Sequence, residues 1–167
     1  MYIMQKKREI KELVFNGGGA RGVGMPGVYY ALKATIDSKN ASILDSIETI
    51  AGTSVGSITA AVFSVGPECD ELKRDIFDQN LLNILEIERA SLPIYVSLEP
   101  LKIFINNYLQ KHIKKYLQEQ NRATTLQGAE LLTLLSNLDN ENYQITFKDL
   151  HSLNLYNPQK FKNLIIT

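Results

Sequence analysis

The sequence predicts an α/β fold in which helices cover a parallel sheet. Three short segments are predicted strands: the apolar runs Leu13–Phe15 and Leu164–Ile166, and the segment Ile47–Ala51 between them; glycine ends the first two along the chain. A short continuous apolar run stopped by glycine is typical of a strand that is buried on both faces. Helical patterns lie between the runs, and this alternation of strand and helix is the order of βαβ units in a parallel sheet.

Helical spacing of apolar residues predicts the remaining elements, over residues 23–33, 57–65, 67–78 with a continuation at 81–87, 101–113, 125–138 and 147–153. Ser97 is expected to cap the helix at 101–113, with Pro100 in its first turn, and Thr146 to cap the last helix. Loops are expected at 38–40 and at 136–142, where polar residues gather.

One predicted helix carries lysines on its polar face. Lys111, Lys114 and Lys115 lie opposite the apolar stripe of the helix at 101–113. A solvent-exposed face is one interpretation of this pattern, and contact with lipid headgroups is the other. Both interpretations remain open at the level of the sequence.

Composition narrows the class of protein. A chain of 167 residues with 44% hydrophobic and 22% charged residues can bury the core of one globular domain. The 18 basic residues balance the 18 acidic ones, so no overall field steers nucleic acid to the chain, although a local basic patch is compatible with this balance. We therefore expect no nucleic-acid partner.

Three further features exclude other classes. Cys69 is the only cysteine, so no internal disulfide can form, and a buried, inert thiol is the expected state. The charged segment Met1–Lys11 is not followed by an apolar core, unlike a secretory signal. The uncharged stretch Thr49–Pro67 is too rich in glycine, serine and threonine to be a convincing membrane span.

A glycine-rich segment, FNGGGARGVG, follows the first predicted strand. Such a cluster indicates that some group must come close to the backbone, and Gly17, Gly19 and Gly22 satisfy the dinucleotide pattern G-x-G-x-x-G. That pattern needs a carboxylate at the end of the second strand, where Glu48 comes too early. A phosphate loop of the Walker type fails as well, because Val23 stands in place of its lysine. A plain tight turn does not need three consecutive glycines and an arginine.

The second predicted strand ends in Gly52-Thr53-Ser54-Val55-Gly56, which fits G-x-S-x-G, the nucleophile elbow. This motif needs a serine on a sharp turn from strand to helix, with small residues on both sides. A strand before it, a helix after it and the glycine loop on the neighbouring strand all favour this interpretation. The loop can supply the N–H groups of an oxyanion hole.

The two motifs together resemble the patatin-like phospholipase family. The similarity rests on Gly17–Gly22, Pro26–Val28, Ala31-Leu32 and Gly52–Ser57, and it is clear over residues 12–66 and looser over 146–167. It implies a three-layer parallel-sheet fold related to the α/β-hydrolases, incomplete and carrying a helical insertion.

The resemblance also divides the chain. We expect a lead-in at 1–11, a core with the glycine loop and elbow at 12–66, a helical insertion at 67–142, and a return to the sheet at 143–167. The patatin domain is expected to be truncated at its C-terminus, so that the chain is the N-terminal part of a longer protein.

The activity that the resemblance implies is hydrolysis of phospholipid or lysophospholipid acyl esters by a Ser–Asp dyad, without a cofactor or metal. Ser54 is then the nucleophile. The other expected roles belong to the oxyanion hole (Gly17, Gly18, Gly19 and the Val55 N–H), to support of the glycine loop (Arg21, Gly22) and to the shape of the elbow (Gly52, Thr53, Gly56).

The aspartate of the dyad is the missing part. The family places it in an Asp-Gly-Gly or Asp-Gly-Ala motif, and none of the seven aspartates here, at 37, 45, 70, 75, 78, 139 and 149, precedes a glycine. We therefore expect the 167 residues alone to be inactive. Asp149 and His151 could complete a Ser–His–Asp triad, but an exposed turn of a short helix is the favoured interpretation, and His112 has less support.

The resemblance implies a setting too. It is strongest to bacterial members, some of which are injected into host cells as effectors without an N-terminal signal peptide. A cytoplasmic protein peripheral to membranes is expected, with lipid at a membrane surface, a protein activator and the remaining part of the patatin domain as partners. The alternative is a non-catalytic module, either a nucleotide-binding βαβ unit that uses the G-x-G-x-x-G loop or a degenerate patatin scaffold.

Overall fold

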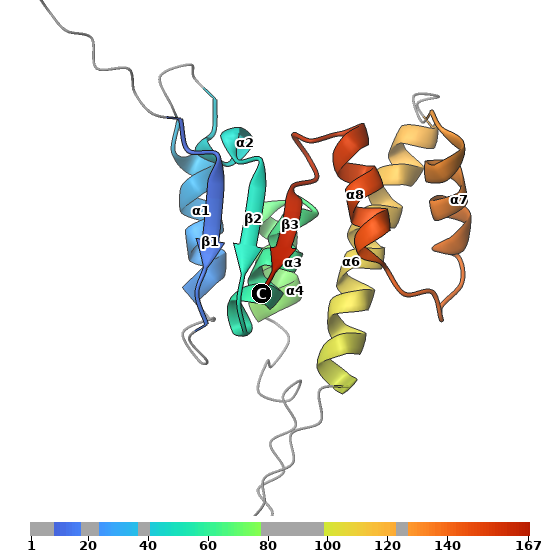
Figure 1. Cartoon of the computed structure of the whole chain (residues 1–167), viewed down its shortest axis with the longest axis horizontal. Helices are drawn as coiled ribbons and strands as arrows, with labels where there is room; N and C mark the ends of the chain where they lie inside the picture. The colour runs from blue at the N-terminus through green and yellow to red at the C-terminus, as the bar shows by residue number, and fades with distance from the viewer. Residues whose placement is uncertain (1–8, 18–23, 37–40, 78–98, 123–126) are drawn as a thin grey trace, which may run out of the picture.

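The computed structural model describes residues 9–17, 24–36, 41–77, 99–122 and 127–167. Their strands form one parallel sheet in the order β1-β2-β3, made of β1 (Glu12–Phe15), β2 (Thr49–Gly52) and β3 (Asn163–Ile166). The register places Val14 beside Ala51 and Ala51 beside Ile165. The predicted α/β class and parallel pairing are thereby confirmed (Figure 1).

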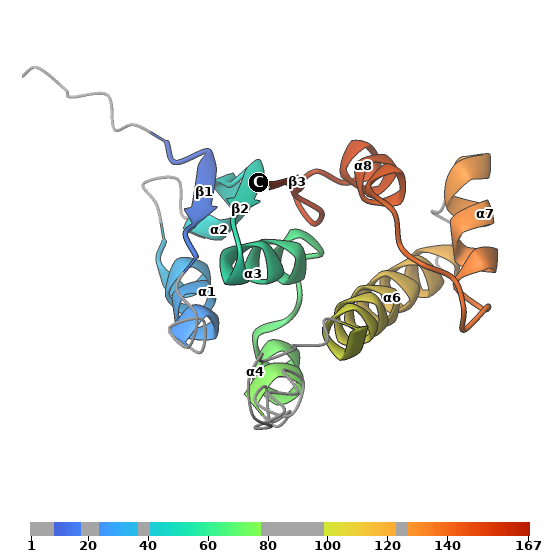
Figure 2. The same ribbon diagram turned by 60° about the horizontal axis from the view of Figure 1, so that its bottom comes forward.

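The face of the sheet that carries Phe15 and Ile50 is packed by helices. Helix α3 (Val55–Ser64) contacts all three strands, α1 (Met25–Ala34) lies beside it, and α4 (Cys69–Phe77) lies farther from the sheet (Figure 2). The Phe63 ring of α3 stands edge-on to that of Phe15, with centroids 5.2 Å apart, and lies 4.5 Å from the ring of Tyr29. Large buried aromatic rings therefore fix α1 and α3 against the sheet.

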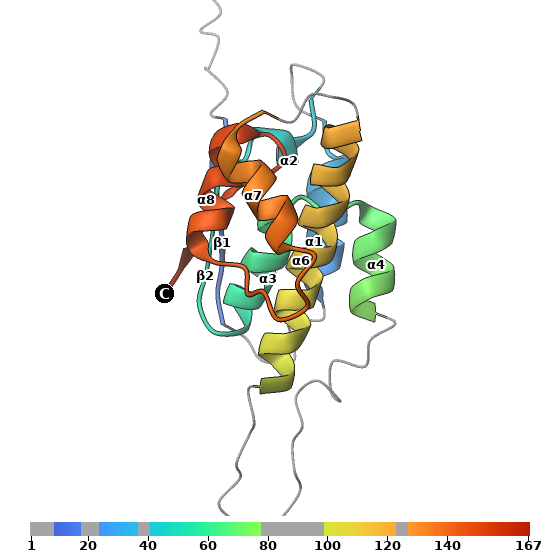
Figure 3. The same ribbon diagram turned by 90° about the vertical axis from the view of Figure 1, so that its right-hand side faces the viewer.

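The second group of helices lies beyond β3. It comprises α6 (Glu99–Arg122), α7 (Ala129–Asn137) and α8 (Phe147–Tyr156), which face the viewer in Figure 3. Its buried residues Ile113, Leu117 and Leu153 belong to the same core as the sheet residues. A short helix, α2 (Ile43–Ser46), precedes β2 and is capped by the side chain of Ser42.

Several element boundaries differ from the predicted ones for local reasons. The strand expected at 47–51 begins only at Thr49, because Ile47 caps the C-terminus of α2. The helix expected from residue 57 begins at Val55, directly after Ser54 and within the elbow. The helix expected from residue 125 begins at Ala129, after Gly128 with φ 106°. The loop expected at 136–142 starts after Asn137, the last residue of α7.

Helices α6 and α8 both continue beyond their predicted last residues, 113 and 153. Helix α6 begins at Glu99 and continues to Arg122, while its expected cap Ser97 and the helix at 81–87 lie outside the described residues. Helix α8 has the expected cap: Thr146 accepts a hydrogen bond from the Asp149 N–H, and the Asp149 carboxylate accepts one from the Thr146 N–H. This reciprocal capping box confirms the predicted start.

The first strand is not buried on both faces, and this prediction was wrong. Val14 is 64% exposed and Ile165 is 45% exposed, on the face of the sheet away from α3. Helix α3 packs on the strands from the other face, and α8, which also contacts β3, lies beside that edge of the sheet (Figure 2). The apolar run at 13–15 therefore has one buried face and one bare face in this part of the fold.

The uncharged stretch at 49–67 folds as β2 followed by the buried helix α3. Searching the described helices gives none that is both long and apolar enough to cross a membrane.

Candidate active site

The candidate site is the turn between β2 and α3. Ser54 is the residue just before α3, with φ 53° and ψ −131°, and it is the one non-glycine residue with positive φ in the described part of the chain. Such a conformation costs about 1–3 kcal/mol and persists only where the surrounding structure enforces it. The predicted geometry of Ser54, on a strained strand-to-helix turn, is confirmed.

Two glycines allow this turn to be tight. A Cβ atom on Gly52 would lie 2.2 Å from the carbonyl oxygen of Gly56, and one on Gly56 would lie 2.2 Å from the carbonyl oxygen of Phe15. Neither position can hold a side chain without movement of the backbone. The glycines of the pentapeptide therefore bring the start of α3 directly against the ends of β1 and β2.

The glycine loop begins beside the serine. A Cβ atom on Gly17 would lie 3.0 Å from the Ser54 Cβ and 3.6 Å from its Oγ. The first glycine of the loop is therefore in contact with the elbow. Gly18, Gly19, Arg21 and Gly22 lie outside the described residues, so their roles stay predictions.

The Ser54 hydroxyl is not used to hold the helix. Ser54 is exposed and its side chain makes no capping hydrogen bond, while backbone bonds close the turn: the Gly56 N–H donates to Thr53 O (2.9 Å) and the Ser57 N–H to Ser54 O (2.8 Å). Val55 is the first residue of α3, and an N–H at this position has no partner within its own helix. The positive end of the helix dipole also lies there and favours a negative charge.

Sequence reasoning missed one polar contact of the elbow. Ser57, in the first turn of α3, donates a hydrogen bond from its Oγ to Gly52 O at 3.0 Å. The signal was a hydroxyl residue directly after the pentapeptide, where the strand end lies within reach.

Asp149 and His151 of α8, which could have completed a triad, do not lie at the elbow. Asp149 accepts hydrogen bonds from the Thr146 N–H (2.8 Å), the Thr146 hydroxyl (2.7 Å) and the Tyr143 hydroxyl (3.0 Å), so its carboxylate holds the cap of α8. His151 is an exposed residue of the same helix, which lies on the far side of β3 from β1 (Figure 1). The structure does not bring these residues to Ser54.

His112 lies in a second polar cluster, between α4 and α6. Its Nδ1 is 3.5 Å from Glu71 Oε2 and its Nε2 is 3.3 Å from Asp75 Oδ2, while its side chain is only 5% exposed. Burial lowers the pKa of His112 below its ordinary value, and the two carboxylates oppose that shift. Because both ring nitrogens face α4, the imidazole joins two helices.

Two lysines of α6, Lys111 and Lys115, belong to the same polar cluster, and Lys114 pairs with a residue that follows α7. Lys111 pairs with Asp75 and Lys115 with Glu71, each at 2.5 Å, and Lys114 pairs with Asp139 at 2.8 Å. Hydrogen bonds to these lysines help to lower the carboxyl pKa of Asp75 and of Glu71. Each of these ammonium groups has an intramolecular partner while its side chain is 36–50% exposed, so the solvent-exposed face and the contact with headgroups both stay predictions.

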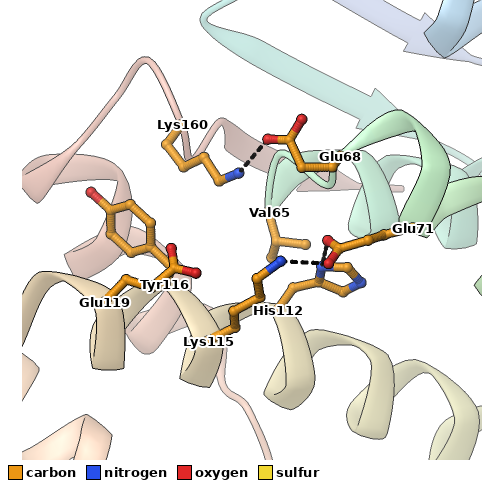
Figure 4. Close-up of a pocket in the computed structure, with 8 residues that line it drawn as sticks. All are labelled: Val65, Glu68, Glu71, His112, Lys115, Tyr116, Glu119 and Lys160. Atoms are coloured by element: carbon orange, nitrogen blue, oxygen red, sulfur yellow. Dashed lines mark hydrogen bonds and ion pairs between the residues drawn. The ribbon is translucent and has the colours of Figure 1, made fainter.

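A cavity of about 90 Å³ adjoins this cluster (Figure 4). It is lined by Val65, Glu68, Glu71, His112, Lys115, Tyr116, Glu119 and Lys160. Two ion pairs lie at the cavity, Lys115 with Glu71 and Lys160 Nζ with Glu68 at 3.7 Å. Among the residues that the structure describes, no set of three His, Cys, Asp or Glu side chains is arranged to hold a metal ion.

Comparison with known proteins agrees with this geometry. An uncharacterized protein, R571 of Acanthamoeba polyphaga mimivirus, is 27% identical over 139 residues, which are 83% of this chain and 44% of that protein. Two structures of ExoU with SpcU, from the type III secretion system of Pseudomonas aeruginosa, superpose with TM-scores of 0.73 and 0.66 at 24% and 26% identity. They cover 95% of this chain and 32% and 30% of theirs, so the chain spans less than half the length of these relatives.

The sequence model of the family described as "Patatin-like phospholipase" matches residues 13–164, nearly the whole chain. This span runs from the first strand, through the elbow and the helices, to the last strand. Together with the shared fold, it shows that the chain belongs to the patatin-like phospholipase family, a family of lipid hydrolases.

Proposed function

We propose that this chain supplies the nucleophile and the oxyanion-binding half of a site that hydrolyses phospholipid acyl esters. The observation that carries the proposal is Ser54 itself: an exposed serine, held at φ 53° between a strand and a helix, with a glycine against its side chain. Strain of this kind is found where a fold presents a reactive group rather than where it only turns the chain.

The residues around Ser54 take the remaining roles in this proposal. Gly52, Thr53 and Gly56 shape the elbow, and the Val55 N–H joins those of Gly17, Gly18 and Gly19 in the oxyanion hole. Arg21 and Gly22 support the glycine loop. The contact of Gly17 with Ser54 supports this arrangement, because donors must lie within about 3 Å of the developing oxyanion.

The reaction needs a base to take the proton of Ser54. When the proton leaves, Oγ bonds to the ester carbonyl carbon and the carbonyl oxygen becomes an anion that the N–H groups stabilise. The anion then collapses, the bond to the leaving alkoxide breaks, and the alkoxide takes the proton back from the base. Water, deprotonated by the same base, then attacks the acyl carbon; the bond to Ser54 Oγ breaks, Oγ takes the proton back from the base, and the fatty acid is released.

We assign that base to an aspartate in an Asp-Gly motif outside these 167 residues. Three of the described aspartates have other surroundings: Asp75 and Asp149 are hydrogen-bonded in α4–α6 and in the cap of α8, and Asp70 accepts a bond from the Tyr30 hydroxyl (2.9 Å). In this proposal residues 12–66 form the catalytic core, 67–142 the helical insertion and 143–167 the return to the sheet.

The setting follows from the substrate. A phospholipid or lysophospholipid ester is presented at a membrane surface, so we propose a cytoplasmic protein that acts there peripherally. ExoU is a type III effector that was solved with SpcU, and this likeness supports secretion into host cells and a protein partner such as an activator.

The test is hydrolysis of phospholipid vesicles by a protein in which this chain continues to an Asp-Gly segment. Ser54→Ala should abolish release of fatty acid, whereas Ser64→Ala, on the same helix but inside the core, should leave it unchanged. The 167 residues alone should be inactive. Hydrolysis by the Ser54→Ala variant would contradict the proposal.

A further inference from the structure

The Ser57 hydroxyl makes a contact that the proposed reaction does not itself require. Ser57 lies in the first turn of α3, and its Oγ donates to the carbonyl oxygen of Gly52, the last residue of β2, at 3.0 Å. Ser54 lies between the two in the chain. The hydrogen bond therefore closes a short loop whose middle is the strained serine.

The Gly52 carbonyl is a junction of three elements. It also accepts a hydrogen bond from the Thr167 N–H, just beyond β3, at 3.1 Å. A carbonyl oxygen has two lone pairs, so it can accept both bonds. Through this one oxygen the first turn of α3 is tied to β2, and β2 to the chain that follows β3.

The other hydroxyl groups on α3 behave differently. Ser64 Oγ donates to Ala61 O (2.8 Å) and Thr59 Oγ1 to Val55 O (3.4 Å), and both acceptors are earlier residues of the helix itself. Hydroxyl groups inside helices commonly bond in this way. Ser57 is distinguished by a bond that leaves the helix and reaches the strand on the other side of Ser54.

We propose that Ser57 is a positioning residue for the nucleophile. A residue with positive φ relaxes unless both of its flanks are fixed. On one flank of Ser54, Gly52 is held in the sheet; on the other, Ser57 holds the first turn of α3 to that same residue. This inference rests on the proposed function of Ser54, because it explains how that hydroxyl is kept in place.

The direct test is NMR of the 167-residue chain. Backbone ¹³C shifts and the Hα–HN coupling of Ser54 report its positive φ. Exchange of the Gly56 amide, which donates to Thr53 O, reports closure of the turn. Ser57→Ala should remove the positive-φ signature and speed Gly56 exchange about tenfold, the change that one hydrogen bond supports. Ser57→Thr keeps the hydroxyl and should restore both, and Ser64→Ala should change neither.

A kinetic test follows in any protein that shows Ser54-dependent hydrolysis. Ser57→Ala should lower kcat about tenfold with KM unchanged, since substrate binding does not involve Ser57, and Ser57→Thr should recover kcat. An unchanged Ser54 signature and Gly56 exchange rate in Ser57→Ala would overturn the inference, even with Ser54 confirmed as the nucleophile. Loss of the signature without any Ser54-dependent hydrolysis would instead overturn the proposed function and leave Ser57 as a backbone clamp.

Discussion

The elbow and the α4–α6 contact are both rich in polar residues, but they are built in opposite ways. At the elbow the backbone is strained, glycines remove side-chain volume, and the Ser54 hydroxyl is exposed without a capping bond. Between α4 and α6, His112 is buried and the charges of Glu71 and Asp75 are met by lysines. The first arrangement leaves a hydroxyl group exposed at a strained turn, and the second uses ionisable groups to join two helices.

This difference shows that residue type alone is a poor guide to a candidate active site. By residue type alone, a histidine between two carboxylates suggests catalysis more strongly than a serine among glycines does. The geometry reverses that order, because both ring nitrogens of His112 face α4. The following predictions test each side of the comparison.

The largest effect is expected from Gly56→Ala. Its Cβ would overlap the Phe15 carbonyl oxygen at 2.2 Å, so β1 and α3 must separate, at a cost of about 3 kcal/mol in the free energy of unfolding. The matched control is Gly27→Ala in α1, where a Cβ meets nothing within 4 Å; replacing a helical glycine there should stabilise the fold by up to about 1 kcal/mol. Urea denaturation measures both. Equal effects of the two substitutions would contradict the close approach at the elbow.

A feature of the fold could be predicted from the sequence when the residues that determine it lie close together in the chain. The elbow was predictable because its signals are local: Gly52, Ser54 and Gly56 lie within five consecutive residues and dictate one turn. The α8 cap was predictable for the same reason, through Thr146, whereas the part that Asp149 plays in it is a finding of the structure. Such features need no knowledge of distant partners.

The features that escaped prediction depend on tertiary contacts. Val14 is exposed because no described helix covers its face of the sheet, and the sequence of a strand does not indicate which helices will cover it. The partners of Lys111 and Lys115 lie about forty residues earlier in the chain, on α4. The bond from Ser57 to Gly52 is local, but a serine after a glycine motif is too common to predict it.

A smaller effect is expected for the α4–α6 cluster, and it depends on pH. Burial lowers the pKa of His112 from 6.5 in the fold, although the carboxylates of Glu71 and Asp75 oppose that shift. Lys111, Lys115 and the ring of Tyr108 also lie around the imidazole. Between its folded and unfolded pKa values the unfolded chain binds more protons, so stability falls as pH drops below 6.5, with a slope of at most about 1.4 kcal/mol per pH unit. Glu71 and Asp75 titrate lower, because their pKa values are depressed below 4.5 and 3.8.

Urea denaturation between pH 5 and 7.5 measures this slope. His112→Gln should reduce it, whereas the matched change at exposed His151, His151→Gln, should leave it as it is. A slope that is unaltered by His112→Gln would show that the cluster does not titrate in this range.

The smallest effect is expected from nucleotides. The glycine loop satisfies G-x-G-x-x-G, but β2 ends in Gly52 and offers no carboxylate for a ribose. Thermal-shift titrations with NAD, FAD and ATP should therefore give no saturable rise in Tm. A clear rise with any of them would favour the nucleotide-binding alternative over the lipase.

The most direct measurement is peptide mapping by mass spectrometry after treatment with a fluorophosphonate probe. An activated serine nucleophile reacts with such probes and an ordinary hydroxyl does not. In the protein that continues to an Asp-Gly segment, the adduct should lie on Ser54, and the 167 residues alone should remain unlabelled. An adduct on another serine, or equal labelling of Ser54 in the short chain, would contradict the account; the second result would place a base within these residues.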